Sequence, residues 1–258
     1  MNTPDWTGIV TWHQGRCGSS VLGSLLNQHS QIQAANEIFS RYMPRRWGDR
    51  PVPAMHEVLQ GTLAERSKPV LNIEIKSLHA QNRSLYPDQK LSDWLNLLRS
   101  HGFRRHVLLR RRHGLRRLTS HLMAQQTGVF VQPTQAPSTC QQPLLINTAA
   151  IREGAATYDL QHWLDLYVAT HSEVLNAVQC FCSVNGLKAP LQLDYEDVIE
   201  DNPVRAYLQI CGWLDLEPEP VTIQQRRINP EPLHQLIANW DEIVQLLEST
   251  THAWMLKQ

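Results

Sequence analysis

Short apolar runs alternate with amphipathic segments along most of this chain, and this alternation limits the folds that the chain can adopt. The runs at residues 8–12, 70–75, 106–109 and 190–194 have the length and composition of strands. Between them, apolar residues recur three and four positions apart, as on one face of a helix. Strands separated by helices are typical of a parallel sheet with both faces covered. We therefore expect an α/β fold with a mainly parallel sheet flanked by helices.

The helical pattern is strongest at residues 158–181 and recurs in several other segments. The expected helices lie at residues 21–26, 52–63, 91–98, 115–122, 158–181, 203–211 and 233–247. Ser19 or Ser20 is expected to cap the first of them. Residues 127–149 are rich in Gln, Pro and Thr and show no period, which indicates a long functional loop. We expect one domain over residues 1–258, with a lid or acceptor-binding insertion around residues 127–155.

The loop after the first strand has the residues of an anion-binding turn. It reads His13-Gln14-Gly15-Arg16-Cys17-Gly18-Ser19-Ser20 and leads directly into a helix. The two glycines allow the backbone to turn N–H groups toward one point, and the helix N-terminus adds the positive end of its dipole. The serine hydroxyls and the Arg16 guanidinium add further donors. An anion site is thus expected at the carboxyl end of this strand; the alternative is that the glycines only close a tight turn.

This loop is not a Walker A loop, because no lysine precedes the serine pair. Asp194, at the end of a strand, is only a weak candidate for a magnesium ligand. An ATP-dependent phosphotransferase is therefore a less favoured alternative.

The segment Gly15-Arg16-Cys17-Gly18-Ser19-Ser20, followed by Leu22, Leu25, Leu26 and His29, resembles the 5′-phosphosulfate loop of sulfotransferases that use 3′-phosphoadenosine 5′-phosphosulfate (PAPS). In carbohydrate-type members this loop commonly reads R-S-G-S-S/T, so Cys17 stands in place of the first serine. Arg16 stands where many cytosolic members have lysine, which relates the chain to the carbohydrate and bacterial branch. The resemblance implies a P-loop NTPase-like sulfotransferase architecture, PAPS as co-substrate and no metal. It also implies that residues 15–20 bind the 5′ end of PAPS.

A second match concerns the spacing of an arginine and a serine. Members of the family carry an arginine at a strand end and a serine eight residues later on the next helix, and both bind the 3′-phosphate. Here Arg112 follows the strand at residues 106–109, and Ser120 lies eight residues beyond it. A guanidinium fork and a hydroxyl are suitable donors for one phosphate. Arg110 and Arg111 remain possible substitutes for Arg112.

Two weaker matches extend the resemblance over almost the whole chain. Tyr195, in Leu193-Asp194-Tyr195-Glu196-Asp197, would lie near the adenine or would only pack at the end of the sheet. Arg226 and Arg227 are similar to a basic segment of bacterial members that closes over the nucleotide, and the alternative for them is a solvated surface.

The implied sulfuryl transfer needs positive groups near the bridging oxygen and a base for the proton of the acceptor hydroxyl. Arg16 suits the first task, and Lys76, at a strand end, could add charge unless it is a solvent-exposed lysine. Glu37, in Asn36-Glu37-Ile38-Phe39, stands where carbohydrate-type and bacterial members have an acid proposed as the base. Its pKa would be tunable toward the working pH. The alternative is a structural ion pair of Glu37 with Arg41 or Arg45.

Three histidines, His13, His29 and His79, are rival candidates for the base. The implied acceptor is a hydroxyl group of a carbohydrate, a glycolipid or a small metabolite. The sequence does not distinguish among these three acceptor classes.

The charge balance argues against a general nucleic-acid-binding protein, since 24 Lys and Arg stand against 24 Asp and Glu. Seven arginines nevertheless lie between Arg104 and Arg117. They leave a non-catalytic anion- or RNA-binding module as a third hypothesis. That hypothesis expects interleaved aromatic residues for base stacking, and the cluster has only Phe103.

No apolar run approaches the roughly 18–20 residues of a membrane helix, and residues 1–7 lack the pattern of a signal peptide. We therefore expect a cytoplasmic protein without a membrane span. The cysteines are odd in number and scattered, which indicates reduced thiols rather than a disulfide framework. They are Cys17, Cys140, Cys180, Cys182 and Cys211.

Overall fold

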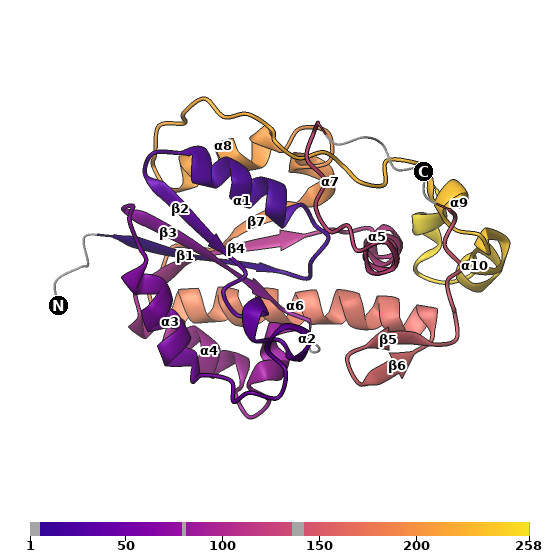
Figure 1. Cartoon of the computed structure of the whole chain (residues 1–258), viewed down its shortest axis with the longest axis horizontal. Coiled ribbons are helices and arrows are strands. Elements are labelled where there is room, and N and C mark those ends of the chain that lie inside the picture. Colours follow the sequence, from indigo (N-terminus) through magenta and orange to yellow (C-terminus); the bar gives the residue numbers. More distant parts are fainter. Residues whose placement is uncertain (1–5, 79–80, 136–141, 258) are drawn as a thin grey trace.

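A five-stranded sheet, with every strand parallel to its neighbours, forms the centre of the computed structural model, which describes residues 6–78, 81–135 and 142–257 (Figure 1). In spatial order its strands are β2 (Ile32–Asn36), β3 (Val70–Lys76), β1 (Thr7–His13), β4 (Phe103–Arg110) and β7 (Leu191–Asp194). The expected α/β fold with a mainly parallel sheet is confirmed. The edge strand β2 was not predicted, because its Gln, Ala and Asn residues give no apolar alternation.

Helices cover both faces of this sheet (Figure 1). The first face is covered by α1 (Ser19–Gln28) and α8 (Val204–Trp213). The second face is covered by α3 (Met55–Ala64), α4 (Leu91–Ser100) and the C-terminal half of α6 (Leu160–Val184). Leu25 and Tyr207 are fully buried in the first layer and Trp94 in the second. Each such side chain contributes about 1.5–3 kcal/mol by leaving water, so both layers hold the strands in place.

A third apolar cluster lies beyond the carboxyl ends of the strands (Figure 1). It is built from α5 (Gly114–Thr127), the N-terminal half of α6, α9 (Leu233–Leu236), α10 (Trp240–Leu247), η3 (Ala253–Leu256) and β5 (Ile151–Glu153), which pairs with β6 (Ala156–Tyr158). The short elements between are η1 (Ser40–Tyr42), α2 (Pro44–Trp47), η2 (Asn82–Leu85) and α7 (Tyr195–Val198). Because α6 is 25 residues long, it joins this cluster to the core under the sheet.

Two predictions of local structure are wrong. The last helix is divided into α9 and α10, because Ile237 is extended and the backbone of Leu144 bonds on both sides of it, to Leu236 and Ala238. The cap of α1 is Gly18 in the left-handed conformation, and neither serine caps the helix. Within the expected insertion around residues 127–155 lies strand β5, which pairs with β6 just beyond it, and residues 136–141 lie outside the described ranges.

The order of the strands defines where this sheet can bind a ligand. From β1 the chain passes through α1 to β2 on one side, whereas from β4 it continues to β7 on the other side. The direction of the connections therefore reverses between β1 and β4. In open α/β sheets the crevice at the carboxyl ends of two such strands is the usual ligand site.

Two further expectations concern the whole chain. In the part of the chain that the structure covers, no helix combines the length and the apolarity needed to cross a membrane. Four described cysteines form no disulfide, as expected, and Cys140 lies outside the described residues. The four are Cys17, Cys180, Cys182 and Cys211.

Candidate functional site

The loop between β1 and α1 curls through residues with positive φ. Gly15 has φ 76°, Arg16 has φ 56° and Gly18 has φ 83°. A Cβ on Gly18 would lie 2.6 Å from Ile199 Cγ2, so only glycine fits there. Left-handed residues turn successive N–H groups of a loop to its inside, which suits an anion. The N–H of Gly15 is already used, because it donates to His13 Nδ1 at 3.1 Å.

A cavity of about 280 Å³ opens at the crevice between β1 and β4, close to the lower limit for small-molecule sites. It brings together eight of the residues that the sequence analysis singled out for the nucleotide. They are Arg16, Gly18, Ser19, Ser20, Ser120, Tyr195, Arg226 and Arg227. Gly15 and Cys17, from the same loop, do not line it, and Cys17 is buried in the core on the α1 side of the sheet.

Arg16 and Ser120 are in direct contact across this cavity. Arg16 Nε donates to Ser120 Oγ at 3.1 Å, and Arg16 Nη1 donates to the carbonyl of Phe130 at 2.7 Å. The sequence predicted that they bind opposite ends of the nucleotide, Arg16 at the 5′-phosphosulfate and Ser120 at the 3′-phosphate. If the two side chains bind opposite ends of one ligand, this contact must first break. Burial, and after it the neighbouring Arg111 and Arg117, lowers the pKa of Arg16 to about 10.

The arginine of the β4 end that faces the cavity is Arg111. Its side chain is buried, its Nη1 donates to the Arg16 carbonyl at 3.2 Å, and its guanidinium lies 4.3 Å from the centre of the Tyr195 ring. Arg112, the residue expected in this role, is exposed and does not line the cavity. Its guanidinium instead donates to Asp197 at 3.0 Å and approaches Asp194 at 3.4 Å.

Arg110 points to the same acidic group as Arg112. Its Nε and Nη2 donate to the two carboxylate oxygens of Asp194, at 2.8 and 3.1 Å. Neighbouring residues at the end of a strand point to opposite sides. Of the three consecutive arginines, only the middle one therefore turns toward the cavity.

Three buried guanidinium atoms at the cavity lack a hydrogen-bond partner among residues 6–78, 81–135 and 142–257. They are Arg111 Nε, Arg226 Nη2 and Arg227 Nε. Arg227 also forms an ion pair with Glu200 at 2.8 Å through its Nη1. A buried donor without an acceptor costs about 1–3 kcal/mol, and more when it is charged. An anion in this cavity would supply the missing acceptors.

Arg117 is a residue of the site that the sequence analysis did not single out. It is only 1% exposed, it lies over the rings of Trp163 and Tyr167, and its Nη2 donates to the Gln14 carbonyl at 2.6 Å. Burial lowers its pKa. Its Nε and Nη1 have no hydrogen-bond partner within the described residues. A guanidinium buried in this way places positive charge directly behind the loop.

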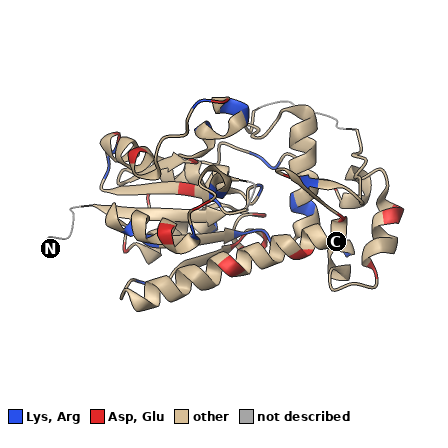
Figure 2. Ribbon diagram, turned by 90° about the horizontal axis from the view of Figure 1, so that it is seen from below, with Lys and Arg blue, Asp and Glu red and all other residues tan. Residues whose placement is uncertain are grey.

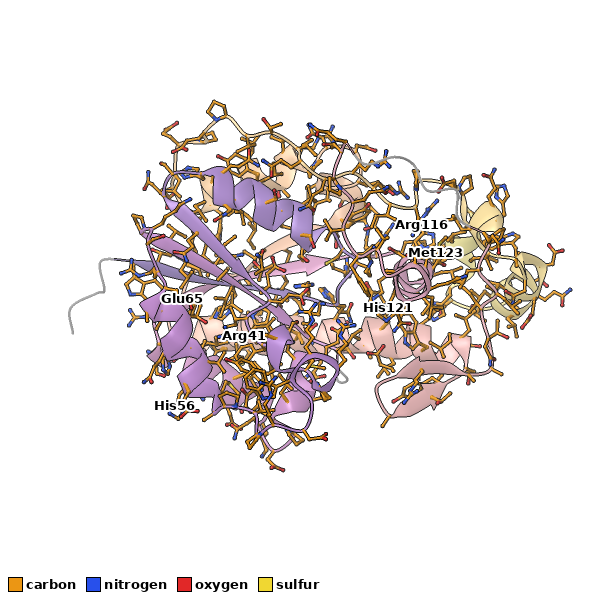
Figure 3. The ribbon with its side chains drawn as sticks, viewed as in Figure 1. Arg41, His56, Glu65, Arg116, His121 and Met123 are labelled. Atoms are coloured by element: carbon orange, nitrogen blue, oxygen red, sulfur yellow. The ribbon has the colours of Figure 1, made fainter. Side chains whose placement is uncertain are left out.

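Two side chains of α5 leave the helix on different sides (Figure 3). Arg116 lines the cavity, whereas His121 lies on another side of the helix. Burial and the neighbouring Arg117 and Arg16 lower the pKa of His121 to about 3. His121 is therefore a neutral imidazole at neutral pH. The run of arginine and histidine residues along this helix was the sequence signal that could have identified both Arg116 and His121.

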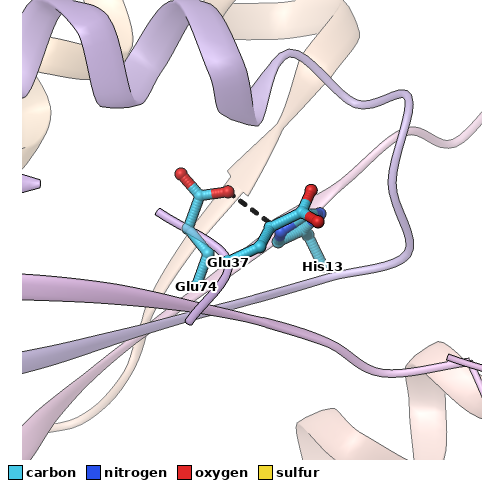
Figure 4. A group of neighbouring side chains, drawn as sticks. All are labelled: His13, Glu37 and Glu74. Carbon is cyan, nitrogen blue, oxygen red and sulfur yellow. Dashed lines mark ion pairs between the residues drawn. The ribbon is translucent and has the colours of Figure 1, made fainter. Parts of the chain in front are cut away.

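A second group of polar residues lies on the other side of the loop (Figure 4). His13, Glu37 and Glu74 each present an atom to a common point, with these atoms within 4.8 Å of one another. Lys76 Nζ lies 2.8 Å from Glu37 Oε1, so a lysine supplies positive charge to the group. A Cβ on Gly15 would lie 3.5 Å from Lys76 Cε, which shows that Lys76 packs against the loop.

Glu37 is half-buried and held by two donors. Lys76 forms its ion pair, and Ser40 Oγ donates to Glu37 Oε2 at 2.5 Å. Burial acts to raise the pKa of Glu37, but Lys76, His13 and the Ser40 hydrogen bond together outweigh it, and the pKa lies below its usual value. The sequence predicted that the pKa of Glu37 would be tuned toward the working pH, whereas in the structure this pKa is lowered. The alternative partners, Arg41 and Arg45, are not the ones that Glu37 contacts in this structure.

The rival histidines differ in their surroundings. His13 is buried, its Nδ1 accepts from the Gly15 N–H, and its Nε2 lies 3.2 Å from Glu74 Oε2, at ion-pair distance but without hydrogen-bond geometry. His29 is buried beside the Glu217 carbonyl, 3.0 Å from its Nε2. His79 lies outside the described residues.

Removal of the Lys76 charge is expected to raise the pKa of Glu37. In the native protein this pKa is depressed, so the carboxylate stays ionised as the pH falls and is protonated only below the ordinary value of about 4.3. Lys76→Met removes the main cause of the depression and should move the midpoint upward. NMR titration of the Glu37 carboxyl carbon measures this directly. The Lys76→Arg variant should keep the low midpoint, and an unchanged midpoint in Lys76→Met would contradict the assigned cause.

The arginine-rich segment between Arg104 and Arg117 does not form one basic face. Figure 2 shows basic and acidic positions interspersed over the ribbon. Arg110 and Arg112 are paired with acidic residues, and Arg111 and Arg117 are buried. A continuous basic surface for the backbone of a nucleic acid is therefore not formed by this segment.

Comparisons with known proteins find a likeness among solved structures. No family model and no curated protein sequence matches the chain. Among solved structures, the crystal structure of a sulfotransferase from Alicyclobacillus acidocaldarius is similar to it with a TM-score of 0.48 and 10% sequence identity. The alignment covers 97% of this chain and 94% of that chain.

Proposed function

We propose that this protein transfers the sulfuryl group of PAPS to a hydroxyl group of a carbohydrate, a glycolipid or a small metabolite. The observation that carries the proposal is the set of buried, unpartnered guanidinium atoms of Arg111, Arg226 and Arg227 around the cavity beside the curled loop. Such a cavity suits a ligand with more than one anionic group. PAPS carries its anionic groups on both sides of its ribose.

The loop and the N-terminus of α1 would bind the phosphosulfate end. Ser19 and Ser20 line the cavity at the first turn of α1, where backbone N–H groups have no partner within the helix. Arg16 would join them once its side chain leaves Ser120. Gly15 and Cys17 would shape the loop rather than touch the ligand.

The 3′-phosphate would lie between α5 and the segment that carries Arg226 and Arg227. Arg111 takes the place that the sequence analysis gave to Arg112, and the Ser120 hydroxyl becomes available when Arg16 moves away. Tyr195 packs against the Arg111 guanidinium and fixes its plane. These groups offer a phosphate several charge-assisted hydrogen bonds.

The reacting end would face Glu37 and Lys76. The acceptor oxygen attacks the sulfur as Glu37 takes its proton, and a new oxygen–sulfur bond forms. The bond from sulfur to the phosphate oxygen breaks, and adenosine 3′,5′-bisphosphate leaves with the electron pair. Arg16, Lys76 and the loop N–H groups stabilise the charge on that oxygen. The Glu37 carboxylate, whose pKa is lowered, is ionised at neutral pH and can accept the proton.

A thermal-shift titration tests the proposal. Adenosine 3′,5′-bisphosphate should stabilise the protein at lower concentration than AMP or ATP with Mg²⁺. At 100 times its dissociation constant it adds about 2.7 kcal/mol, or roughly 5–10 °C in Tm for a chain of this size. Preference for ATP with Mg²⁺ would indicate a phosphotransferase instead. Salt-sensitive RNA binding without nucleotide binding would indicate an RNA-binding module.

A further inference from the structure

Asn229 is a buried polar residue of the cavity for which the phosphate sites give no role. It follows Arg226 and Arg227 in the same segment, it is 8% exposed, and it lines the cavity. Within the described residues neither its Oδ1 nor its Nδ2 has a hydrogen-bond partner. Buried amide groups in proteins are almost always paired. An Asn with both atoms unpaired therefore indicates a partner that comes from outside the chain.

The chemistry of the amide restricts that partner. Nδ2 is a donor and could meet a phosphate or sulfate oxygen, but Oδ1 is an acceptor and would be repelled by it. The partner must therefore offer a donor next to an acceptor. The edge of a nucleobase has this arrangement, and the amide of Asn pairs with adenine through two hydrogen bonds, with its amino group and a ring nitrogen.

The surroundings of Asn229 suit a flat apolar ring. The same cavity is lined by apolar side chains near Asn229 in sequence, Ile228 and Leu233, and by Ile199 from beyond α7. The charged lining comes from arginines and from two carboxylates, namely Arg16, Arg111, Arg116, Arg226, Arg227, Glu200 and Asp201. A ligand pocket with apolar walls and a few well-placed polar groups selects its ligand through those groups.

We propose that Asn229 recognises the base of the bound nucleotide as a 6-aminopurine. Its Oδ1 accepts from the exocyclic amino group, and its Nδ2 donates to the adjacent ring nitrogen N7. This inference rests on the proposed function, because it takes the nucleotide to be one with adenine. Asn229 is a residue that determines specificity and takes no part in the transfer of the sulfuryl group.

The test compares adenosine 3′,5′-bisphosphate with inosine 3′,5′-bisphosphate, in which an oxygen replaces the amino group. Isothermal titration should give native protein that prefers the adenosine compound by about 10-fold. In Asn229→Leu, and in the smaller Asn229→Ser, the preference should fall to about one because the adenosine compound binds more weakly. The melting temperature of ligand-free Asn229→Leu should not be lower than that of the native protein, because the replaced amide has no partner to lose.

Asn202 provides the matched control. Its Oδ1 accepts from the Val204 N–H at 3.1 Å near the start of α8, and it does not line the cavity. Asn202→Leu should therefore lower the melting temperature and leave the preference between the two nucleotides unchanged. This is the opposite pattern to that expected for Asn229→Leu.

The two proposals fail in different ways. If the native protein binds neither nucleotide, the proposed function is wrong, and the inference on Asn229 is wrong with it. If the native protein binds the adenosine compound but does not distinguish it from the inosine compound, only the role of Asn229 is wrong. The role of Asn229 is also wrong, with the proposed function intact, if both Asn229 variants keep the native preference for the adenosine compound. It is likewise wrong if ligand-free Asn229→Leu melts several degrees below the native protein.

Discussion

Glu37→Gln is expected to lower the turnover of sulfuryl transfer by about 100- to 10,000-fold, the usual contribution of a general base. The amide has nearly the shape of the carboxylate but cannot take a proton from the acceptor hydroxyl. Lys76 would lose its ion-pair partner at 2.8 Å and present an unpaired positive charge beside the loop. Binding of adenosine 3′,5′-bisphosphate should therefore be as tight as in the native protein or tighter. The variant therefore shows whether Glu37 acts in turnover without contributing to nucleotide binding.

The measurement is transfer from radiolabelled PAPS to a panel of hydroxyl acceptors, alongside calorimetric titration with adenosine 3′,5′-bisphosphate. Glu65→Gln is the matched control, since Glu65 is an exposed carboxylate at the end of α3, apart from the site (Figure 3). It should leave both quantities unchanged. Full turnover in Glu37→Gln with intact binding would exclude Glu37 as the base.

The layered fold could be predicted because it follows from periodicity. Buried strands such as β3 and β4 are apolar throughout their central part, and α6 repeats its apolar residues over its whole length. The division of the last helix was not predictable in the same way. The apolar positions of α9 and α10 continue one helical period, and only the pairing of Ile237 with Leu144, far away in sequence, shows the break.

The loop at residues 14–18 could be located from its glycines, but its internal hydrogen bonds could not. The sequence shows that Gly15 and Gly18 permit a left-handed backbone, and both adopt it. It does not show that the Gly15 N–H is taken by His13, or that His13 is held in turn by Glu74 on β3. These contacts depend on the register of β1 against β3, which pairs His13 with Lys76 and Thr11 with Glu74.

The direction of a side chain at the end of a strand is the hardest feature to predict. A shift of one residue turns the side chain to the opposite side of the sheet. Spacing alone left Arg110, Arg111 and Arg112 as alternatives, and Arg112 gave the spacing of eight residues to Ser120. The acidic residues that hold Arg112 come from β7 and α7, more than eighty positions later in the chain. No local pattern near Arg112 contains them.

Arg111→Gln is expected to weaken nucleotide binding, whereas Arg112→Gln at the adjacent position is expected to leave it unchanged. Arg111 is buried, lines the cavity and has an unpartnered Nε among the described residues. Loss of hydrogen bonds to a charged group costs about 1.5–3 kcal/mol, so Arg111→Gln should weaken binding of adenosine 3′,5′-bisphosphate by about 10- to 150-fold. Arg111→Lys keeps the charge but loses the planar fork, and it should recover only part of the affinity.

Arg112→Gln removes exposed ion pairs with Asp194 and Asp197. Such pairs contribute about 0.2–1 kcal/mol, so the variant should be slightly less stable and should bind the nucleotide as the native protein does. The decisive quantity is the ratio of the affinities for adenosine 3′,5′-bisphosphate and AMP, which isolates the 3′-phosphate. That ratio should fall toward one in Arg111→Gln only. If it falls in Arg112→Gln and not in Arg111→Gln, the 3′-phosphate binds outside the cavity described here, because an arginine held by acidic residues would have to leave them to reach it.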